Sequence, residues 1–455
     1  MDQFMFTVDR SLPTSLPNQI ATGMRALFGS GKLAAGDRVP STRELARQLG
    51  VSRGSVVAAY DQLVAEGFLL SAQGAPTVVH PCLPRRAAVA PHSPAPARPS
   101  QQRTISLRPS SRHAGTIGTA AWRRAWREAA DAPARDIDKS GEPRLRSAIA
   151  EHLRLARGLT VDPGTVLVTG GSRDGLLLIL MSLGRSLRVG VEDPGHPGLR
   201  TIIPLAGHTP VTCRTDARGV VVEALPDDLD ALLVTPSHLY PLGGAMPAPR
   251  RAELLEWAAS RGVVVIEDDF NSELRYRISP QPPLATLSTD ATVITLGTFT
   301  TLLSKQFSAG YVVAGATAVG ALRRTREMLG MPVSPVTQHA IANLLEGGHV
   351  RRNARAMHRR LAERKDIVSA QVVPALRRNG ATEIEREEVL GVDLLVRFGD
   401  GAAQEEFENR LNAGGFECGH VDAESPEGIL ISFGHLSQRE FDAAMGAIRK
   451  IPGEG

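Results

Sequence analysis

The stretch LAAGDRVPSTRELARQLGVSRGSVVAAYDQLVAEGFLLSAQG, residues 33–74, contains the most specific local signals in the chain. Ser41 followed by Glu44 forms a capping box, which predicts the start of a short helix that ends at Gly50. After a tight turn, Ser52 caps a second helix. The apolar runs that follow are typical of two short strands around a turn. This order of elements predicts a winged helix-turn-helix.

The second helix of this motif has an apolar face and a polar face. The apolar positions predicted to be buried are Val56, Val57, Tyr60, Leu63 and Val64. The polar face begins with Ser52, Arg53 and Ser55, whose hydroxyls and guanidinium suit phosphate oxygens or a guanine edge. Arg43, at the start of the preceding helix, and Gly74, in the wing, complete the predicted DNA-binding residues. The alternative is a three-helix domain that binds a protein.

The net charge of +4 at pH 7 is unevenly distributed along the chain. Residues 1–80 hold seven Lys/Arg and six Asp/Glu, whereas residues 81–112 hold six Arg and no acid, which leaves the remainder at −3. A basic first quarter is expected if this part meets a polyanion, although a solvated arginine-rich linker fits equally well. Residues 81–115 are rich in Pro, Ala, Arg and Ser, which predicts an extended linker.

Several classes of protein are disfavoured by the composition. No run of eighteen apolar residues is present, so no transmembrane helix is expected, and the first residues do not resemble a secretory signal. The three cysteines, Cys82, Cys213 and Cys418, are far apart and show neither a disulfide framework nor metal-ligand spacing. We therefore expect a cytoplasmic protein without a metal site.

Beyond the linker, short apolar runs alternate with helical ones, which predicts an α/β domain with a mostly parallel sheet. The predicted strands are TVLVTGG, LRVGVEDP, DALLVTPSH, VVVIEDDF and ATVITLGTF, and two strands of a smaller α/β part are LGVDLLVRF and GILISFG. The expected organisation is a DNA-binding domain at 1–80, the linker at 81–115 and a large domain at 116–455. Within it, we expect a large subdomain at about 140–340 and a small one at about 345–450.

Residues 13–80 resemble the DNA-binding domain of the GntR family of bacterial repressors. The matching residues are Pro40-Ser41-Thr42-Arg43-Glu44-Leu45-Ala46, Leu49-Gly50-Val51-Ser52-Arg53, Val56, Tyr60, Leu63 and Glu66-Gly67. The wing departs from the family pattern, because the usual Arg and Gly-Ser-Gly-Thr tip are replaced by Ala72-Gln73-Gly74-Ala75-Pro76-Thr77.

Nearly the whole chain resembles one GntR subfamily, the MocR-type regulators. Matching blocks include Leu145-Arg146-Ser147-Ala148, Ala156-Arg157-Gly158, Glu192-Asp193-Pro194, Thr235-Pro236-Ser237-His238, Glu267-Asp268-Asp269 and Gly297-Thr298-Phe299. The resemblance implies a winged helix-turn-helix joined to an aminotransferase-like domain, that is, the type I fold of pyridoxal-phosphate-dependent transferases. It also implies a homodimer that binds double-stranded operator DNA and usually carries pyridoxal phosphate.

The resemblance also places the residues of a cofactor pocket. Asp268 matches the carboxylate that pairs with the pyridine nitrogen, and Ser172 and Arg173 open the helix that receives the phosphate. His238 matches directly, whereas His196 and Phe270 each stand where a tyrosine is usual. The arginine that grips an amino-acid carboxylate falls on Leu430 in the segment GILISFG.

The lysine that forms the Schiff base is not at its expected position. The family pattern Gly-Thr-Phe-Ser-Lys, continued to an Arg and a Gly-Tyr, aligns without gaps from Gly297 to Tyr311. The Ser becomes Thr300, the Lys becomes Thr301 and the Arg becomes Ser308. Without a lysine there is no internal aldimine and no general base, so transamination should be absent.

The sequence therefore predicts a transcription regulator, not an enzyme, whose altered pocket binds a small effector without covalent chemistry. The effector could be a pyridoxal compound, another small anion, or nothing at all. In a second hypothesis, pyridoxal phosphate is still bound covalently, through Lys305. A third is an active aminotransferase with an accessory domain. A fourth is a large domain that serves only for dimerisation.

Overall fold

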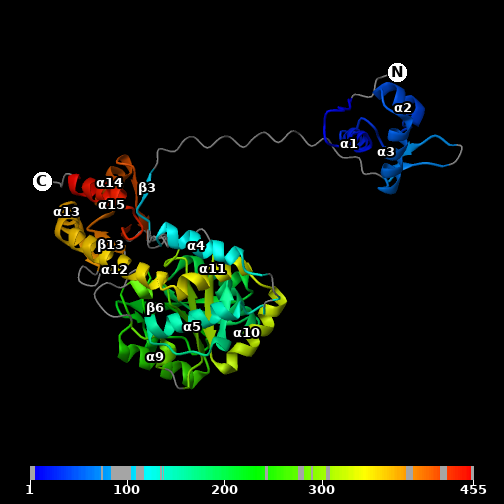
Figure 1. Cartoon of the computed structure of the whole chain (residues 1–455). Coiled ribbons are helices and arrows are strands. Elements are labelled where there is room, and N and C mark those ends of the chain that lie inside the picture. Colours follow the sequence, from blue (N-terminus) through cyan, green and yellow to red (C-terminus); the bar gives the residue numbers. More distant parts are fainter. Residues whose placement is uncertain are drawn as a thin grey trace. The chain divides into compact units, whose positions relative to one another are not determined.

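The structure, a computed structural model, divides the chain into two compact units, residues 1–101 and residues 102–455 (Figure 1). Each unit is considered by itself. The residues described are 6–72, 75–82, 104–108, 117–133, 136, 138–240, 244–274, 281–287, 290–303, 308–385, 393–420 and 428–451.

The N-terminal unit is a three-helix domain with a two-stranded hairpin, as the sequence predicts. Its helices are α1 (Leu16–Gly29), α2 (Thr42–Leu49) and α3 (Arg53–Ala65). Strands β1 (Leu69–Leu70) and β2 (Val78–Val79) pair antiparallel to form the wing. A single apolar core joins all three helices to both strands.

The caps of α2 and α3 set the geometry of the helix-turn-helix. The Ser41 and Ser52 hydroxyls accept hydrogen bonds from backbone amides in the first turns, and Gly50 ends α2 in the left-handed conformation at φ 64°. The reciprocal half of the predicted capping box is not observed, because the Glu44 carboxylate instead accepts hydrogen bonds from Arg47 and Gln48.

The buried face of α3 differs from the prediction at two positions. Val56, Tyr60 and Leu63 are buried as predicted, but Val57 is only half-buried and Val64 is 36 % exposed. Ala59, which was not predicted, is buried as well. These four buried positions recur at spacings of three and four residues, which is the stripe that one helical face provides. The Tyr60 hydroxyl donates to the Pro40 carbonyl over 2.8 Å and so fixes α3 against the start of α2.

The large unit is built on a mixed eight-stranded sheet with the order β4-β11-β10-β9-β8-β5-β6-β7. The strands from β10 to β6 are parallel, and β4, β11 and β7 are antiparallel to their neighbours. Their bounds are β4 (Val166–Thr169), β5 (Arg188–Asp193), β6 (Thr209–Asp216), β7 (Gly219–Val220), β8 (Ala231–Val234), β9 (Val264–Asp268), β10 (Val293–Thr298) and β11 (Gly310–Ala314). All five predicted strands are present. The strands β6, β7 and β11 were not predicted.

Helices cover both faces of this sheet, as the nearly continuous burial along its central strands requires. One face packs against α4 (Thr119–Ala130), α5 (Pro143–Arg157), α9 (Ala248–Arg261) and α11 (Pro335–Glu346). The opposite face packs against α6 (Ser172–Leu183), α8 (Ile202–Leu205) and α10 (Ala316–Leu329). The result is a three-layer α/β/α sandwich whose parallel strands end at a common edge.

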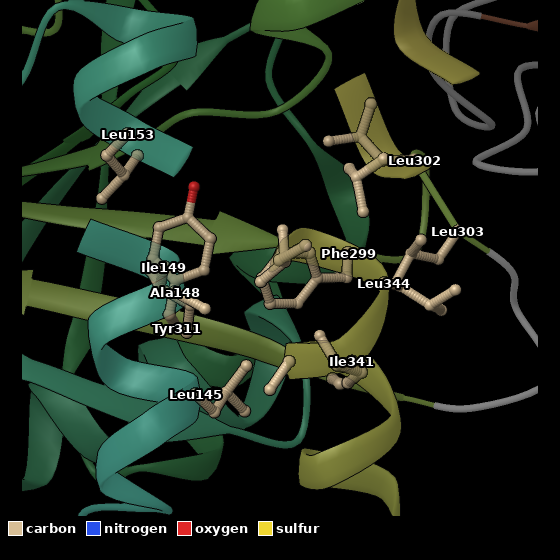
Figure 2. Close-up of a cluster of buried hydrophobic side chains, with 14 of the residues drawn as sticks. Leu145, Ala148, Ile149, Leu153, Phe299, Leu302, Leu303, Tyr311, Ile341 and Leu344 are labelled. Carbon is tan, nitrogen blue, oxygen red and sulfur yellow. The ribbon is translucent and has the colours of Figure 1, made fainter. Parts of the chain in front are cut away.

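A buried cluster anchors the segment that leaves β10 (Figure 2). Phe299 and Tyr311 are tilted rings whose centroids lie 5.5 Å apart. Side chains of α5, such as Ile149, and of α11, such as Ile341, pack around them. Because the core fixes Phe299, it also restricts the positions of the next two residues, Thr300 and Thr301.

The C-terminal part of the unit forms a second sheet with the order β12-β13-β16-β15. These strands are β12 (Ala381–Glu385), β13 (Asp393–Phe398), β15 (Gly419–His420) and β16 (Ile429–Ser432). The long helix α12 (His349–Ile367) leads into this part, and α13 (Val373–Arg378), α14 (Gly401–Ala413) and α15 (Gln438–Lys450) pack on the sheet. Both strands predicted here are observed.

One segment of the predicted linker is folded. Strand β3 (Ile105–Ser106) pairs in parallel with β14 (Phe416–Glu417), and Leu107 is fully buried in the C-terminal core. The prediction that all of 81–115 is an extended linker is therefore wrong for this segment. Ile105 and Leu107 face inward and alternate with exposed residues, which is a strand pattern too short to recognise among prolines and arginines.

Further contacts fix this strand. The Leu107 amide donates to the Glu417 carbonyl and its own carbonyl accepts from the Ser432 amide, each over 2.7 Å. Arg108 forms an ion pair with Glu417 at 2.7 Å. His435 Nε2 lies 2.8 Å from the Ser106 carbonyl. The chain that enters the large unit is thus bound first to its C-terminal part.

Candidate DNA interface and altered cofactor pocket

The start of α3 presents polar groups in an arrangement suited to DNA. Ser52 Oγ lies 2.8 Å from Ser55 Oγ, and Arg53 between them is exposed. Gly54 has open space around it, since the nearest atom to an added Cβ would be Ser52 Oγ at 3.9 Å. A backbone phosphate can therefore approach the first amides of the helix closely.

Four arginines of this unit form two groups that differ in their partners. Arg25 and Arg47 are neutralised by Glu66 and Glu44, at 2.6 and 2.7 Å. In the described part of the chain, Arg43 and Arg53 make no ion pair, although both are exposed. Unpaired guanidinium groups at the starts of both helices are available for phosphates or a base edge. Gly74, the predicted wing residue, lies outside the described residues.

In the large unit, buried carboxyl groups gather at the ends of the parallel strands. Asp268 ends β9 and is only 2 % exposed. Burial, together with the negative charges of Asp269, Glu192 and Glu267, raises the pKa of Asp268 to about 8. Removing a carboxylate from water favours its neutral form unless a cation is close. A ligand with a protonated ring nitrogen would supply such a cation.

The neighbouring carboxyl groups are held by backbone and hydroxyl donors. Glu192 accepts from the Thr235 amide at 3.0 Å and from its hydroxyl at 2.6 Å. Glu267 accepts from the Leu284 amide at 2.9 Å. Burial raises the pKa of Glu192 to about 7 and that of Glu267 to about 8. Both residues lie in sequence blocks quoted above, but no motif assigned them to the pocket.

Asp269 is the carboxylate of this group that has a direct cationic partner. Arg157, at the end of α5, donates to its two oxygens over 2.8 and 3.1 Å and also to Ser237 Oγ over 3.0 Å. The ion pair is fully enclosed. An ionic pair in this setting positions strand ends and adds little net stability. Arg157 therefore connects the end of α5 to the segments that follow β8 and β9.

Four aromatic rings form a series of contacts that includes Phe270, two residues after Asp268. The His196 and Tyr240 rings are 5.1 Å apart, and His196 and Phe270 meet edge-on at 6.0 Å. His238 also meets Phe270 edge-on, at 5.8 Å. The structure thus brings the predicted residues His196, His238 and Phe270 together and adds Tyr240, which the sequence analysis missed. These flat apolar walls suit a planar ring.

The residues predicted to bind a phosphate lie at or near the start of α6. Gly171 (φ 98°) precedes Ser172, the first residue of α6. Ser308 Oγ donates to the Gly170 carbonyl, and a Cβ on Gly171 would lie 2.8 Å from that hydroxyl. Arg173 is exposed, and its Nη2 would lie 2.7 Å from a Cβ on Gly198. Ser308 therefore lies against the turn that leads into Ser172, whereas the Arg173 guanidinium packs towards the His196 segment.

Thr300 and Thr301 follow the anchored Phe299. The Thr298 hydroxyl donates to Thr300 Oγ1 over 3.0 Å and accepts from the Thr300 amide at 3.2 Å. Thr301 is buried. Gly297 and Tyr311 are direct cross-strand partners, and the Tyr311 ring leaves no room for a Cβ on Gly297. Lys305 lies outside the described residues.

No metal site is indicated in the ranges that the structure describes, since no three His, Cys, Asp or Glu residues come together suitably there. Within the same ranges, no helix is long and apolar enough to cross a bilayer.

Comparisons with known proteins agree with this arrangement. Residues 16–79 match the family "Bacterial regulatory proteins, gntR family", and residues 114–381 match "Aminotransferase class I and II". The solved structure of a kynurenine aminotransferase from Pyrococcus horikoshii is similar with a TM-score of 0.66 and 21 % identity, covering 77 % of this chain and 90 % of that one. The fold and site thus define a GntR-type DNA-binding domain fused to an aminotransferase-like domain.

Two curated regulators identify the subfamily. The chain is 44 % identical over 356 residues to the HTH-type pyridoxine biosynthesis transcriptional regulator PdxR of Corynebacterium glutamicum, covering 78 % of each chain. It is 30 % identical over 419 residues to the probable rhizopine catabolism regulatory protein MocR of Rhizobium meliloti, covering 87 % of this chain and 84 % of that one. The chain belongs to the MocR-type transcriptional regulators of the GntR family.

Proposed function

We propose that this regulator binds operator DNA as a homodimer and that its altered pocket holds a small ligand without covalent attachment or transamination. The observation that carries the proposal is the pairing of Asp268, still buried at the end of β9, with Thr301 at the position that matches the catalytic lysine. A carboxylic acid can bind a ring nitrogen, whereas a threonine cannot form a Schiff base.

The pocket has features that fit pyridoxal phosphate. Asp268 would meet the ring nitrogen, the rings of His196 and Phe270 would flank the pyridine, and Ser172 with the first amides of α6 would hold the phosphate. The bound group supplies electron withdrawal when its nitrogen is protonated. Here the protein's own residues would only bind and orient it, since Phe270 lacks a phenol and Leu430 cannot grip a carboxylate.

On the DNA side, Arg53 and the hydroxyls of Ser52 and Ser55 would face the major groove, with Arg43 on the phosphate backbone. This assignment is supported by the exposure of both arginines and by the lack of ion pairs to them in the described residues. A single N-terminal unit can make only a few contacts to DNA. Two units in one dimer would bind more tightly, because the first bound unit gives the second a high effective concentration.

The dimer proposal is supported by an apolar surface at the junction of α10 and α11. Met328 is 80 % exposed, and Leu329 and Val336 are 45 % and 41 % exposed. Grouped exposed apolar side chains of this kind are common at protein interfaces. Pro332, between them, lies 3.5 Å from where a Cβ on Gly170 would be. An interface here would adjoin the loop that carries Ser308.

The decisive experiment is an absorbance spectrum of the full-length protein with pyridoxal phosphate, followed by borohydride reduction and peptide mapping. We expect no aldimine band and no modified lysine, although the ligand should raise the melting temperature. Thr301→Lys is the positive control, because it places an amine next to Phe299. A reduced adduct on Lys305 in the wild type would show that the cofactor is held covalently and overturn the proposal.

A further inference from the structure

A small cavity adjoins His196 and is not used by the proposed cofactor contacts. Its volume is about 10 Å³. The residues that line it come from the ends of β5 and β8 and from the segment after β5, and they include Val191, Glu192, His196, Leu199, Leu233 and Thr235. One water molecule needs about 10–15 Å³, so the cavity has room for a single water and for no larger ligand.

Two side chains at this cavity have a polar atom without a hydrogen-bond partner. Glu192 is 5 % exposed, and both donors from Thr235 go to its Oε2 atom. Its Oε1 atom is shielded from solvent and has no donor among the described residues, and His196 Nδ1 is likewise shielded and unpaired there. Buried polar atoms are nearly always paired, so two unpaired atoms at one cavity indicate a shared partner.

The shared partner has to suit two groups that can each donate or accept. Burial raises the pKa of Glu192 to about 7, so this carboxyl group is present in both protonation states near neutral pH. Burial and the charge of Arg173 lower the pKa of His196, so its ring is neutral at pH 7.5. The Nδ1 atom of a neutral ring donates or accepts according to the tautomer. A water molecule satisfies every combination, because it can donate and accept.

Glu192 is also connected to the ring that packs against His196. The Thr235 hydroxyl donates to Glu192 and accepts from the Tyr240 amide at 3.3 Å. The rings of Tyr240 and His196 have their centroids 5.1 Å apart. A Cβ on Gly195 would lie 2.2 Å from the Glu192 carbonyl oxygen, so the turn before His196 packs directly on Glu192. Glu192 therefore contacts the segments that carry both rings.

We propose that one ordered water molecule occupies this cavity and bridges Glu192 Oε1 to His196 Nδ1. Glu192 is then a positioning residue for two rings of the ligand pocket, since it orients His196 through the water and Tyr240 through Thr235. The water site does not depend on any ligand, whereas the positioning role rests on the proposed function. Rings that are already fixed lose less conformational freedom when a planar ligand binds, so binding is tighter.

The water site is tested in the ligand-free, full-length protein. A crystal structure at high resolution should show one water within hydrogen-bond distance of both Glu192 Oε1 and His196 Nδ1. Protein labelled with ¹⁵N in its histidine rings gives a second readout, in which the His196 signals are assigned by their loss in His196→Phe. The Nδ1 signal should move in Glu192→Met, which removes both carboxyl oxygens. It should stay near its wild-type position in Glu192→Gln, whose amide can still bind the water.

Melting temperatures test whether the two side chains act together. The change in the Glu192→Met, His196→Phe double variant should differ from the sum of the two single changes by roughly 1 °C or more, because either change alone breaks the bridge. The matched control combines Glu192→Met with His208→Phe. His208 is buried at the opposite end of β5, where its Nδ1 accepts from the Leu187 amide at 3.1 Å, so these two changes should add.

Pyridoxal phosphate tests the positioning role. In calorimetry, Glu192→Met should bind it roughly fivefold more weakly than the wild type, because the two rings are no longer fixed, and Glu192→Gln should stay within about twofold. If Glu192→Met does not fold, His196→Phe replaces it, since that variant keeps a ring but loses Nδ1. The wild-type crystal structure then decides the water site.

Each other outcome overturns a defined part. A cavity without water, a direct contact between Glu192 and His196, or additive melting changes in their double variant would refute the bridge. If the water is present but Glu192→Met binds pyridoxal phosphate as tightly as the wild type, the positioning role is refuted and the proposed ligand pocket stands. If the wild type does not bind pyridoxal phosphate, the proposed pocket and the positioning role fail together, and the ligand-free measurements still decide the water site.

Discussion

The ionisable residues of the DNA-binding unit and those of the altered pocket differ in their exposure to solvent. In the first, Arg43 and Arg53 are solvated, so they remain charged at little cost until DNA neutralises them. In the second, Asp268 and its neighbours are enclosed, so keeping them destabilises the folded protein whenever they ionise. Surface charges can be kept for many reasons. Buried acids without direct cationic partners point more strongly to a ligand.

Breaking the proposed dimer should have the largest effect. Met328→Glu places a charge in the apolar surface of α10 and α11, so the protein should become monomeric. Operator affinity should then fall by roughly 100-fold or more, because the second half-site no longer benefits from effective concentration. Sedimentation and operator binding measure both effects. Leu205→Glu, at a residue 73 % exposed on α8, is the control. A Met328→Glu protein that remains dimeric would refute this interface.

A single change in the DNA-binding unit should have a smaller effect. Arg53→Ala should weaken operator binding by about 1–3 kcal/mol if the side chain reads a base edge. Arg47→Ala is the matched control, since Arg47 is also exposed but is paired with Glu44 at 2.7 Å. Binding is compared on operator and random DNA. Equal losses on both would make Arg53 a phosphate contact and remove it from sequence readout.

The smallest effect concerns the stability of the pocket. The pKa of Asp268 is about 8 in the folded protein, whereas its ordinary value, which applies to the unfolded chain, is 3.8. The folded state therefore binds this proton more tightly, and stability falls as pH rises from about 4 to about 8. Asp268→Asn removes this loss.

Without ligand, the Asp268→Asn protein should melt on the order of 3 °C higher than the wild type at pH 8.5. The difference should shrink towards pH 5, where Asp268 is protonated. Glu192 and Glu267 titrate in the same direction, so part of the pH dependence should persist in the variant. A constant difference at every pH would mean that Asp268 is not the titrating group.

Local signals sufficed for most of the fold. The caps at Ser41 and Ser52 and the left-handed Gly50 are determined within a few residues, so the sequence predicts them well. Parallel strands such as β9 are continuous apolar runs and were also predicted. By contrast, β11 and the folded segment at 105–108 depend on partners far along the chain, which periodicity alone does not reveal.

The pocket was predictable where the family pattern names a residue and not elsewhere. Asp268, His196 and Phe270 lie together as the resemblance implied. Glu192 and Tyr240 were missed, because their roles arise from burial and from neighbours on other segments of the chain.

In the proposed dimer, the pairing of β3 with β14 also limits how far apart two operator half-sites can be. The chain is anchored again at Thr104, so the span that starts at Cys82 covers 82–104. Even when fully extended, this span reaches at most roughly 75 Å. If the first anchored residue were residue 117, the span would reach about 40 Å further. Permitted half-site separations are therefore counted in a few turns of DNA, each about 34–36 Å. Operators with wider spacing would require the DNA itself to bend.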